Sequence, residues 1–182
     1  MAFSLSIGII ARVGNTQKTF VAFKNKFTTV SKLILYIGIP LVLIALFYFL
    51  GPKPKKAAWN LVMPQVPQEA IALENYVTIQ EGKHKIKANN EARIIWNDSS
   101  KKKTPYSVVY LHGFYASQEE GDPVHLEFAK KFGCNLYLAR LADHGIDSVD
   151  QLINFTVDRG WESAKEALAI GKALGDKVII MG

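Results

Sequence analysis

The stretch Ser107-Val108-Val109-Tyr110-Leu111-His112-Gly113-Phe114 decides the fold that we expect for this chain. Its first five residues form a nearly continuous apolar run, which is typical of a strand buried on both faces of a sheet. Gly113 then allows a sharp turn that brings backbone N–H groups to the surface. Amides fixed in such a turn can stabilise a negatively charged oxygen during acyl transfer. The stretch therefore predicts a buried strand that ends in an anion-stabilising turn.

The segments around this strand predict an α/β fold. Two β-prone runs precede it, and we expect residues 76–79 and 92–96 to form paired outer strands. After it, the apolar spacing predicts a helix, a strand, a helix and a last buried strand, at residues 123–132, 135–139, 161–174 and 178–181. Such alternation is typical of a mostly parallel sheet with helices on both faces. Sites in these sheets lie at the carboxyl ends of the strands, here residues 111–114, 140–147 and Gly182.

Three of these strand ends resemble the α/β-hydrolase family. Residues 108–114 resemble its oxyanion turn, and residues 178–182 resemble the strand that feeds its G-x-S-x-G nucleophile elbow. Between them, Leu141-Ala142-Asp143-His144-Gly145 resembles the loop after the family's next strand, although Ala142-Asp143 replaces the usual Pro-Gly pair. The resemblance covers residues 76–182 and implies the N-terminal half of an α/β-hydrolase sheet.

The resemblance implies roles for four residues. The backbone N–H of Phe114 would be one oxyanion-hole donor, His112 and Gly113 would form the turn, and Gly182 would begin the nucleophile elbow. The family's nucleophile, acid and histidine would all follow Gly182, so no catalytic triad can be assigned in this chain. The nucleophile's identity stays open, since an aspartate there would indicate a dehalogenase or an epoxide hydrolase. We expect neither a cofactor nor a bound metal.

Residues 33–50 form a run of 18 residues without a charged side chain. A helix of this length rises about 27 Å, close to the ~30 Å hydrocarbon core of a bilayer. Lys32 closes one end, and three lysines between residues 53 and 56 close the other. The run therefore predicts a transmembrane anchor in the lipid bilayer. A buried core helix and a cleaved signal peptide are the alternatives, but core helices are seldom apolar on every face and no small-residue cleavage site follows.

The anchor divides the chain into four predicted segments. They are a basic N-terminal segment (1–32), the transmembrane anchor (33–50), a linker rich in proline and lysine (51–68) and a partial α/β-hydrolase domain (69–182). The flanking positive charges favour a single-pass membrane protein with its N-terminus in the cytoplasm and the domain on the other side.

Charge is distributed unevenly along the chain. The first 68 residues hold eight of the 22 basic residues and no acidic residue, and the rest hold the other 14 and all 16 acidic residues. A nucleic-acid partner would require clustered positive charge on the folded domain, so we expect none. Cys134 is the single cysteine, which excludes a disulfide within the chain. Its apolar neighbours predict that it is buried.

The histidines and one acidic loop are further candidates for chemistry. We expect His112 to brace the turn rather than to act as a base. His144 lies in a loop whose glycine turn explains its position, so we expect no catalytic role for it. His84 and His125 are expected at the surface. The loop Glu119-Glu120-Gly121-Asp122 could hold a metal, but its final aspartate better fits an N-cap of the helix that follows.

Two functions fit this sequence. The first is a membrane-anchored enzyme, a serine hydrolase that cleaves small or lipid-like carboxylic esters through an acyl-enzyme. In that case the chain is an inactive fragment, because its nucleophile is missing. The second is a non-catalytic single-pass membrane protein whose hydrolase-like remnant binds a partner. Ending inside a buried strand would leave an apolar sheet edge exposed, which favours a fragment.

Overall fold

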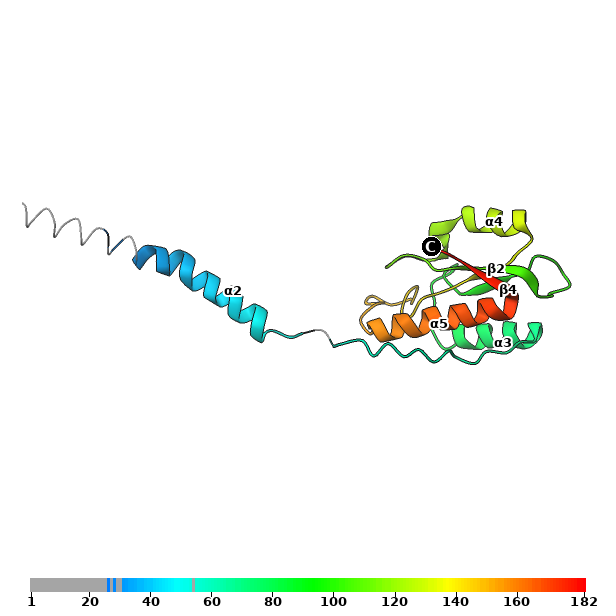
Figure 1. Cartoon of the computed structure of the whole chain (residues 1–182), viewed down its shortest axis with the longest axis horizontal. Helices are drawn as coiled ribbons and strands as arrows, with labels where there is room; N and C mark the ends of the chain where they lie inside the picture. The colour runs from blue at the N-terminus through cyan, green and yellow to red at the C-terminus, as the bar shows by residue number, and fades with distance from the viewer. Residues whose placement is uncertain (1–25, 27, 29–30, 54) are drawn as a thin grey trace, which may run out of the picture. The chain divides into compact units, whose positions relative to one another are not determined.

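The computed structural model describes residues 26, 28, 31–53 and 55–182. The chain divides into two compact units, Met1–Lys55 and Lys56–Gly182. In the first unit the helix over Ser31–Leu50 is long and apolar enough to cross a membrane, and none of its apolar window is buried. It contains the elements η1 (Ile34–Gly38) and α2 (Ile39–Leu50), shown in Figure 1. Most of the predicted basic segment 1–32 lies outside the described residues.

The apolar helix continues through Pro40 by widening one turn. Pro40 has no N–H to donate, and a proline ring crowds the carbonyl four residues earlier. The preceding element η1 is a π-helix, in which the Ile39 N–H donates to the carbonyl of Ile34, five residues back. The wider turn accommodates the proline without ending the helix.

The second unit is built around a four-stranded mixed sheet. Its strands are β1 (Arg93–Ile95), β2 (Thr104–Tyr110), β3 (Asn135–Leu138) and β4 (Gly175–Met181). They lie in the order β1-β3-β2-β4. β2 runs parallel to both β3 and β4, and β1 is antiparallel to β3. An α/β fold with a mostly parallel sheet is therefore present.

Helices cover both faces of this sheet (Figure 1). On one side lies α4 (Val124–Phe132), and on the other lie α3 (Ala70–Glu81) and α5 (Val157–Leu174). Successive residues of a strand point to opposite faces. Val108 accordingly belongs to the cluster under α4, and Val109 belongs to the cluster under α3 and α5. Each such side chain stabilises the fold by roughly 1.5–3 kcal/mol when it is fully buried. The two clusters therefore hold the helices against the sheet and keep the strands in place.

Residues 70–81 form the helix α3, so the prediction of an outer strand at residues 76–79 is wrong. β-branched and aromatic residues favour a strand there, but strand propensity depends strongly on context. Leu73 and Val77 are both buried, and residues four apart lie on one face of a helix. Packing of this pair against the core favours the helix. β1 pairs with β3 instead of with a neighbouring outer strand.

Three other features differ from expectation: the start of one helix, the cap of another and the burial of the last strand. α5 begins at Val157 rather than at residue 161, because the Thr156 hydroxyl accepts a hydrogen bond from the Arg159 N–H and caps the helix. Asp122 does not cap α4, whose N-cap is Pro123 and has no side-chain cap. β4 is not fully buried, since Ile180 is 58% exposed.

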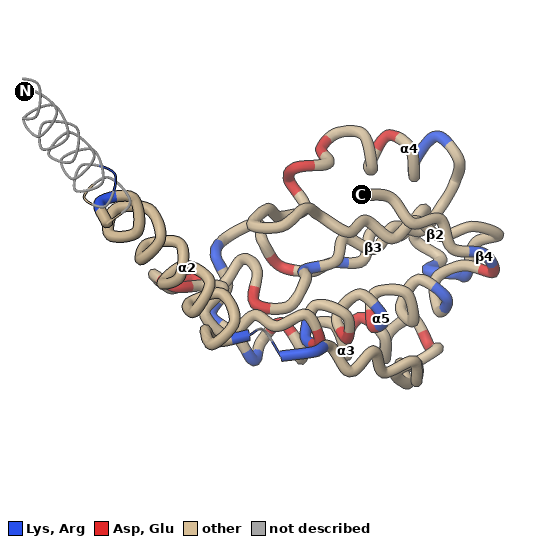
Figure 2. The backbone as a smooth tube through the Cα atoms, turned by 60° about the vertical axis from the view of Figure 1, so that its left-hand side comes forward, with Lys and Arg blue, Asp and Glu red and all other residues tan. Residues whose placement is uncertain are grey.

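The predicted linker over residues 51–68 is divided between the two units. From Lys56 onward the chain belongs to the globular unit, and Val66 packs against the core beside α3. Charges of both signs are spread along this unit (Figure 2), whereas residues 33–50 carry none.

Candidate functional site

The turn after β2 lies at the surface and keeps a free amide. The Ala116 N–H donates to the Gly113 carbonyl at 3.2 Å, and Tyr115 has a φ of 65°. A type II turn requires a positive φ at this third position. Phe114 is 71% exposed, and within the described part of the chain no acceptor takes its backbone N–H.

His112 connects this turn to the loop after β3. It is buried, its Nδ1 lies 2.9 Å from the Gly113 carbonyl, and its Nε2 lies 3.1 Å from the Leu141 N–H. A carbonyl only accepts, so Nδ1 carries the proton and Nε2 is the acceptor. Burial lowers the pKa of His112, which keeps the ring neutral at pH 7. Both ring nitrogens are occupied, so the side chain braces the turn.

Glu120 holds the same turn from the other side. The Gly113 N–H donates to Glu120 Oε2 at 2.7 Å. A Cβ at position 113 would lie 3.1 Å from each Glu120 carboxylate oxygen, tighter than an ordinary contact. The acidic loop thus positions the turn. Among the described residues no group of three or more His, Cys, Asp or Glu side chains is placed to hold a metal ion.

The loop after β3 is fixed at several points. Its Asp143 and Gly145 have positive φ values of 62° and 66°. A Cβ at Gly145 would lie only 2.8 Å from Asn90 Cβ, so a larger residue would not fit. The Arg159 guanidinium donates two hydrogen bonds of 2.7 Å to the Asp143 carboxylate. The loop is therefore held rigidly beside the turn.

His144 is a buried side chain with an unsatisfied nitrogen. Its Nδ1 lies 2.9 Å from the Ala142 carbonyl, which makes Nε2 the acceptor. Nε2 has no hydrogen-bond partner. The ring centroid lies 5.0 Å from that of His112, 5.5 Å from Phe114 and 5.7 Å from Phe155. An orphaned buried acceptor costs about 1–3 kcal/mol.

An apolar cavity of about 340 Å³ adjoins these residues. Its walls come from the turn, the loop after β3, the start of α5 and residue 59, and include Leu111, Phe114, Leu141, His144, Trp161 and Ala164. The Trp59 and Trp161 rings meet edge to face at 5.5 Å. Sequence reasoning did not find this cavity, because Trp59 and Trp161 are about a hundred positions apart.

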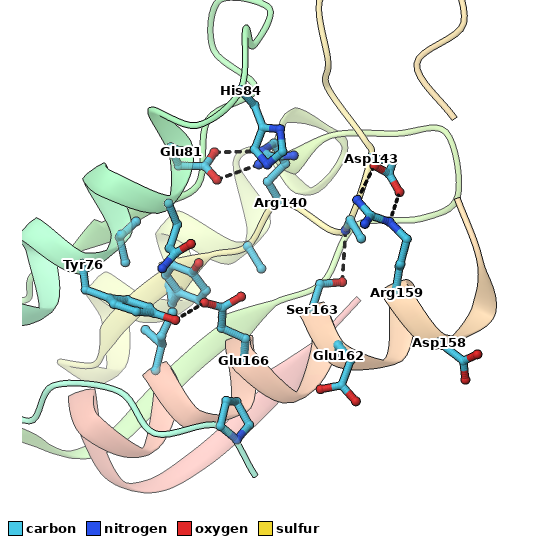
Figure 3. A pocket seen from close by; sticks show the side chains of 17 residues that line it. Tyr76, Glu81, His84, Arg140, Asp143, Asp158, Arg159, Glu162, Ser163 and Glu166 are labelled. Atoms are coloured by element: carbon cyan, nitrogen blue, oxygen red, sulfur yellow. Dashed lines mark hydrogen bonds and ion pairs between the residues drawn. The ribbon is translucent and has the colours of Figure 1, made fainter. Parts of the chain in front are cut away.

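A second, charged cavity of about 570 Å³ is lined by residues of α3, α5 and the loop after β3 (Figure 3). Six of its polar groups are paired with one another: Arg140 with Glu81 at 2.8 and 2.9 Å, Arg159 with Asp143, and Tyr76 with Glu166. Burial, and then the hydrogen bond to Glu166, raises the pKa of Tyr76 to about 12. These pairs join the two helices and the loop.

Gly182 lies beside the end of β2. The Leu111 N–H donates to the Met181 carbonyl at 2.8 Å. A Cβ on Gly182 would lie 2.4 Å from the Leu111 carbonyl oxygen, too close for any side chain. The structure therefore places His112, Gly113, Phe114 and Gly182 together at the carboxyl ends of two neighbouring strands, β2 and β4.

Of the remaining side-chain predictions, the one for His125 is wrong and the one for Cys134 is confirmed. His125 is buried, so its expected surface position is wrong: its Nε2 lies 2.9 Å from the Gln118 carbonyl, and its ring meets Tyr110 edge to face. The short helix η2 (Gln118–Gly121) covers it, and no local pattern signals that contact. Cys134 is buried as expected, and burial raises its pKa.

No protein-family model matches this chain, and no curated protein matches it. In the unit Lys56–Gly182 no serine, threonine or cysteine side chain hydrogen-bonds to a histidine.

Proposed function

We propose that this chain belongs to a membrane-anchored α/β-hydrolase that cleaves carboxylic esters through a serine nucleophile. One observation carries the proposal: the Phe114 amide is free and lies just beyond the carboxyl end of β2, beside the end of β4. The turn is exposed and the neighbouring strands are parallel. An inward-pointing turn or antiparallel neighbours would have argued against it.

The proposed reaction combines these positions with the resemblance to α/β-hydrolases, which implies a serine two residues beyond Gly182 and a histidine further on. The serine oxygen attacks the ester carbonyl carbon while that histidine takes the serine proton, and the carbonyl oxygen takes up the negative charge. The Phe114 N–H donates to that oxygen, and donors fixed before the reaction are usually the largest single stabilising contribution. The alcohol then leaves with the proton from the histidine, and water, losing a proton to the same histidine, attacks the acyl-enzyme to release the acid and restore the serine. The apolar cavity beside Phe114 has the lining to receive the acyl chain.

The apolar helix supplies the anchor in this proposal. Ser31–Leu50 spans the bilayer, and lysines flank it on both sides. The flanking charges favour the cytoplasm for the N-terminus and the opposite side for the hydrolase.

Fluorophosphonate labelling of the native protein in membranes tests the nucleophile, and two variants of Phe114 test the amide. Proline is favoured at the second position of a type II turn, so Phe114→Pro removes the N–H while preserving the turn. Loss of one oxyanion donor slows reaction about 10²–10³-fold. Phe114→Ala keeps the N–H and is the matched control, with labelling within a few-fold of the unchanged protein.

Absence of any labelled band would contradict a serine nucleophile and favour the non-catalytic alternative. Equal labelling rates for the proline and alanine variants would show that the Phe114 amide has no part in the reaction.

A further inference from the structure

A short strap of chain, residues 58–62, is fixed along α5 with its apolar side chains outward. Three hydrogen bonds hold it: Ala58 N–H to Asp158 Oδ1 at 2.7 Å, Trp161 Nε1–H to the Asn60 carbonyl at 2.6 Å, and Lys165 Nζ to the Val62 carbonyl at 2.8 Å. Leu61 and Val62 are nevertheless 77% and 74% exposed. Polar contacts thus fix the backbone, while the Leu61 and Val62 side chains remain exposed to solvent.

The strap continues into the mouth of the apolar cavity. Trp59, Phe114 and Val157 line that cavity and are themselves exposed. Together with Leu61 and Val62 they form what we name the apolar rim. Contiguous exposed apolar side chains of this kind mark binding surfaces for membranes or proteins.

The length of the chain between the anchor and the rim limits how far the rim can lie from the bilayer. Only nine positions separate Leu50, the end of the apolar helix, from Trp59. A fully extended chain advances at most about 3.6 Å per residue, so Trp59 lies no more than about 32 Å from the end of a membrane span. Tryptophan favours the lipid–water interface, and Trp59 is the first tryptophan after the apolar helix.

We propose that the apolar rim rests on the lipid bilayer in which the chain is anchored, so that the apolar cavity opens toward lipid acyl chains. The bilayer contact stands on the exposed strap and the short tether. The assignment of a membrane lipid ester as the substrate class rests in addition on the proposed hydrolase function.

Lipid contact is measured on the full chain reconstituted in vesicles of phosphatidylcholine and phosphatidylglycerol. Leu61→Cys carries a polarity-sensitive fluorophore, and Phe132→Cys is the matched control, since Phe132 is also apolar and 60% exposed but lies on α4, on the opposite face of the sheet. Cys134 is buried, and the unsubstituted chain checks that it stays unlabelled. Spin-labelled lipid should quench the Leu61→Cys label several-fold more than the control label. Adding Val62→Glu should reduce that quenching.

Equal quenching at the two positions would overturn the bilayer contact. Shielding of the Leu61→Cys label that appears only at high protein-to-lipid ratio would also overturn it, because a second copy of the chain would then cover the rim. The fluorescence readout needs no catalysis. Lipid quenching of the Leu61→Cys label without fluorophosphonate labelling of the native protein would support the bilayer contact and contradict the proposed hydrolase function. Fluorophosphonate labelling without lipid quenching would support the hydrolase function and contradict the bilayer contact.

Discussion

The two cavities of the globular unit are both lined by α5 and the loop after β3, but they differ in whether their polar groups have hydrogen-bond partners. In the charged cavity each arginine forms two hydrogen bonds with a carboxylate. In the apolar cavity the main polar group is His144, whose Nε2 has no partner. Charged groups that pair with one another are less available to a ligand, whereas the described residues that line the apolar cavity include no Asp, Glu, Lys or Arg side chain. We therefore expect the charged cavity to stabilise the fold, and we propose that the apolar cavity is the one that binds a ligand.

The largest expected effect is the loss of Arg140 from the charged cavity. The Arg140 and Glu81 side chains are only 8% and 14% exposed, and Arg140 also donates to the His144 carbonyl at 3.1 Å. Arg140→Met removes the charge that pairs with the Glu81 carboxylate and leaves it the Ala92 N–H as a donor; breaking such a buried pair costs about 3–5 kcal/mol. Urea unfolding of the full chain in detergent, followed by tryptophan fluorescence, measures this loss.

The control for Arg140 is the surface pair Lys85–Asp147, with side chains 82% and 45% exposed. Lys85→Met should cost less than about 1 kcal/mol. Combining Arg140→Met with Glu81→Met removes both charges and should recover part of the lost stability. Equal losses for Arg140→Met and Lys85→Met would mean that the charged cavity is not held together by this pair.

The next effect concerns binding to the apolar cavity. Ala164→Phe places a ring in the cavity and should weaken binding of a dansyl-labelled twelve-carbon fatty acid by about tenfold, or 1.4 kcal/mol. Energy transfer from tryptophan to the dansyl group reports binding, since Trp59 and Trp161 line this cavity. Gln80→Phe, in the charged cavity, is the control and should leave binding unchanged. A loss in the control instead would reverse the assignment of the two cavities.

The sequence predicts the strands and the turn of this site better than the cavity around it. The apolar run at residues 107–111 and the glycine after it are local signals, and the structure places them in β2 and its turn. The strand at 135–138 and the helix that ends before Gly175 are found in the same way. The α/β class follows from their alternation.

Features made by distant contacts are not predictable from local patterns. α3 is a helix because Leu73 and Val77 face the core, although its residues favour a strand. The strap over residues 58–62 depends on partners in α5 roughly a hundred positions away. The Gly113–Glu120 contact depends on how the acidic loop folds back on the turn. These contacts decide which amides are free and which are occupied.

His112, which joins the two strand ends beside the apolar cavity, should make stability depend on pH. Burial lowers its pKa in the folded state, so the unfolded chain takes up a proton first as the pH falls below its ordinary value of about 6.5. The stabilisation is complete above that pH and is lost below it, by at most about 1.4 kcal/mol per pH unit. Urea unfolding between pH 7.5 and roughly pH 5 should show this slope.

His112→Gln should flatten the pH dependence of the unfolding free energy, because the titrating ring is gone. His84 is exposed, so His84→Gln is the control and should keep the full slope. An unchanged slope in His112→Gln would assign the pH dependence to other groups.

The smallest expected effect separates position from charge at the turn. Glu120→Gln keeps an acceptor for the Gly113 N–H but removes a negative charge close to the proposed oxyanion. Because Glu120 is exposed, the free energy of unfolding should change by less than about 1 kcal/mol. Two unit charges a few ångströms apart interact by only about 1 kcal/mol in water, so fluorophosphonate labelling should become faster by a few-fold at most.

Glu120→Ala removes the acceptor as well, and if Glu120 positions the turn, this variant should label more slowly than Glu120→Gln. Identical rates for the two variants would mean that Glu120 acts on the site through its charge alone, and that His112 by itself is enough to hold the Phe114 amide in place.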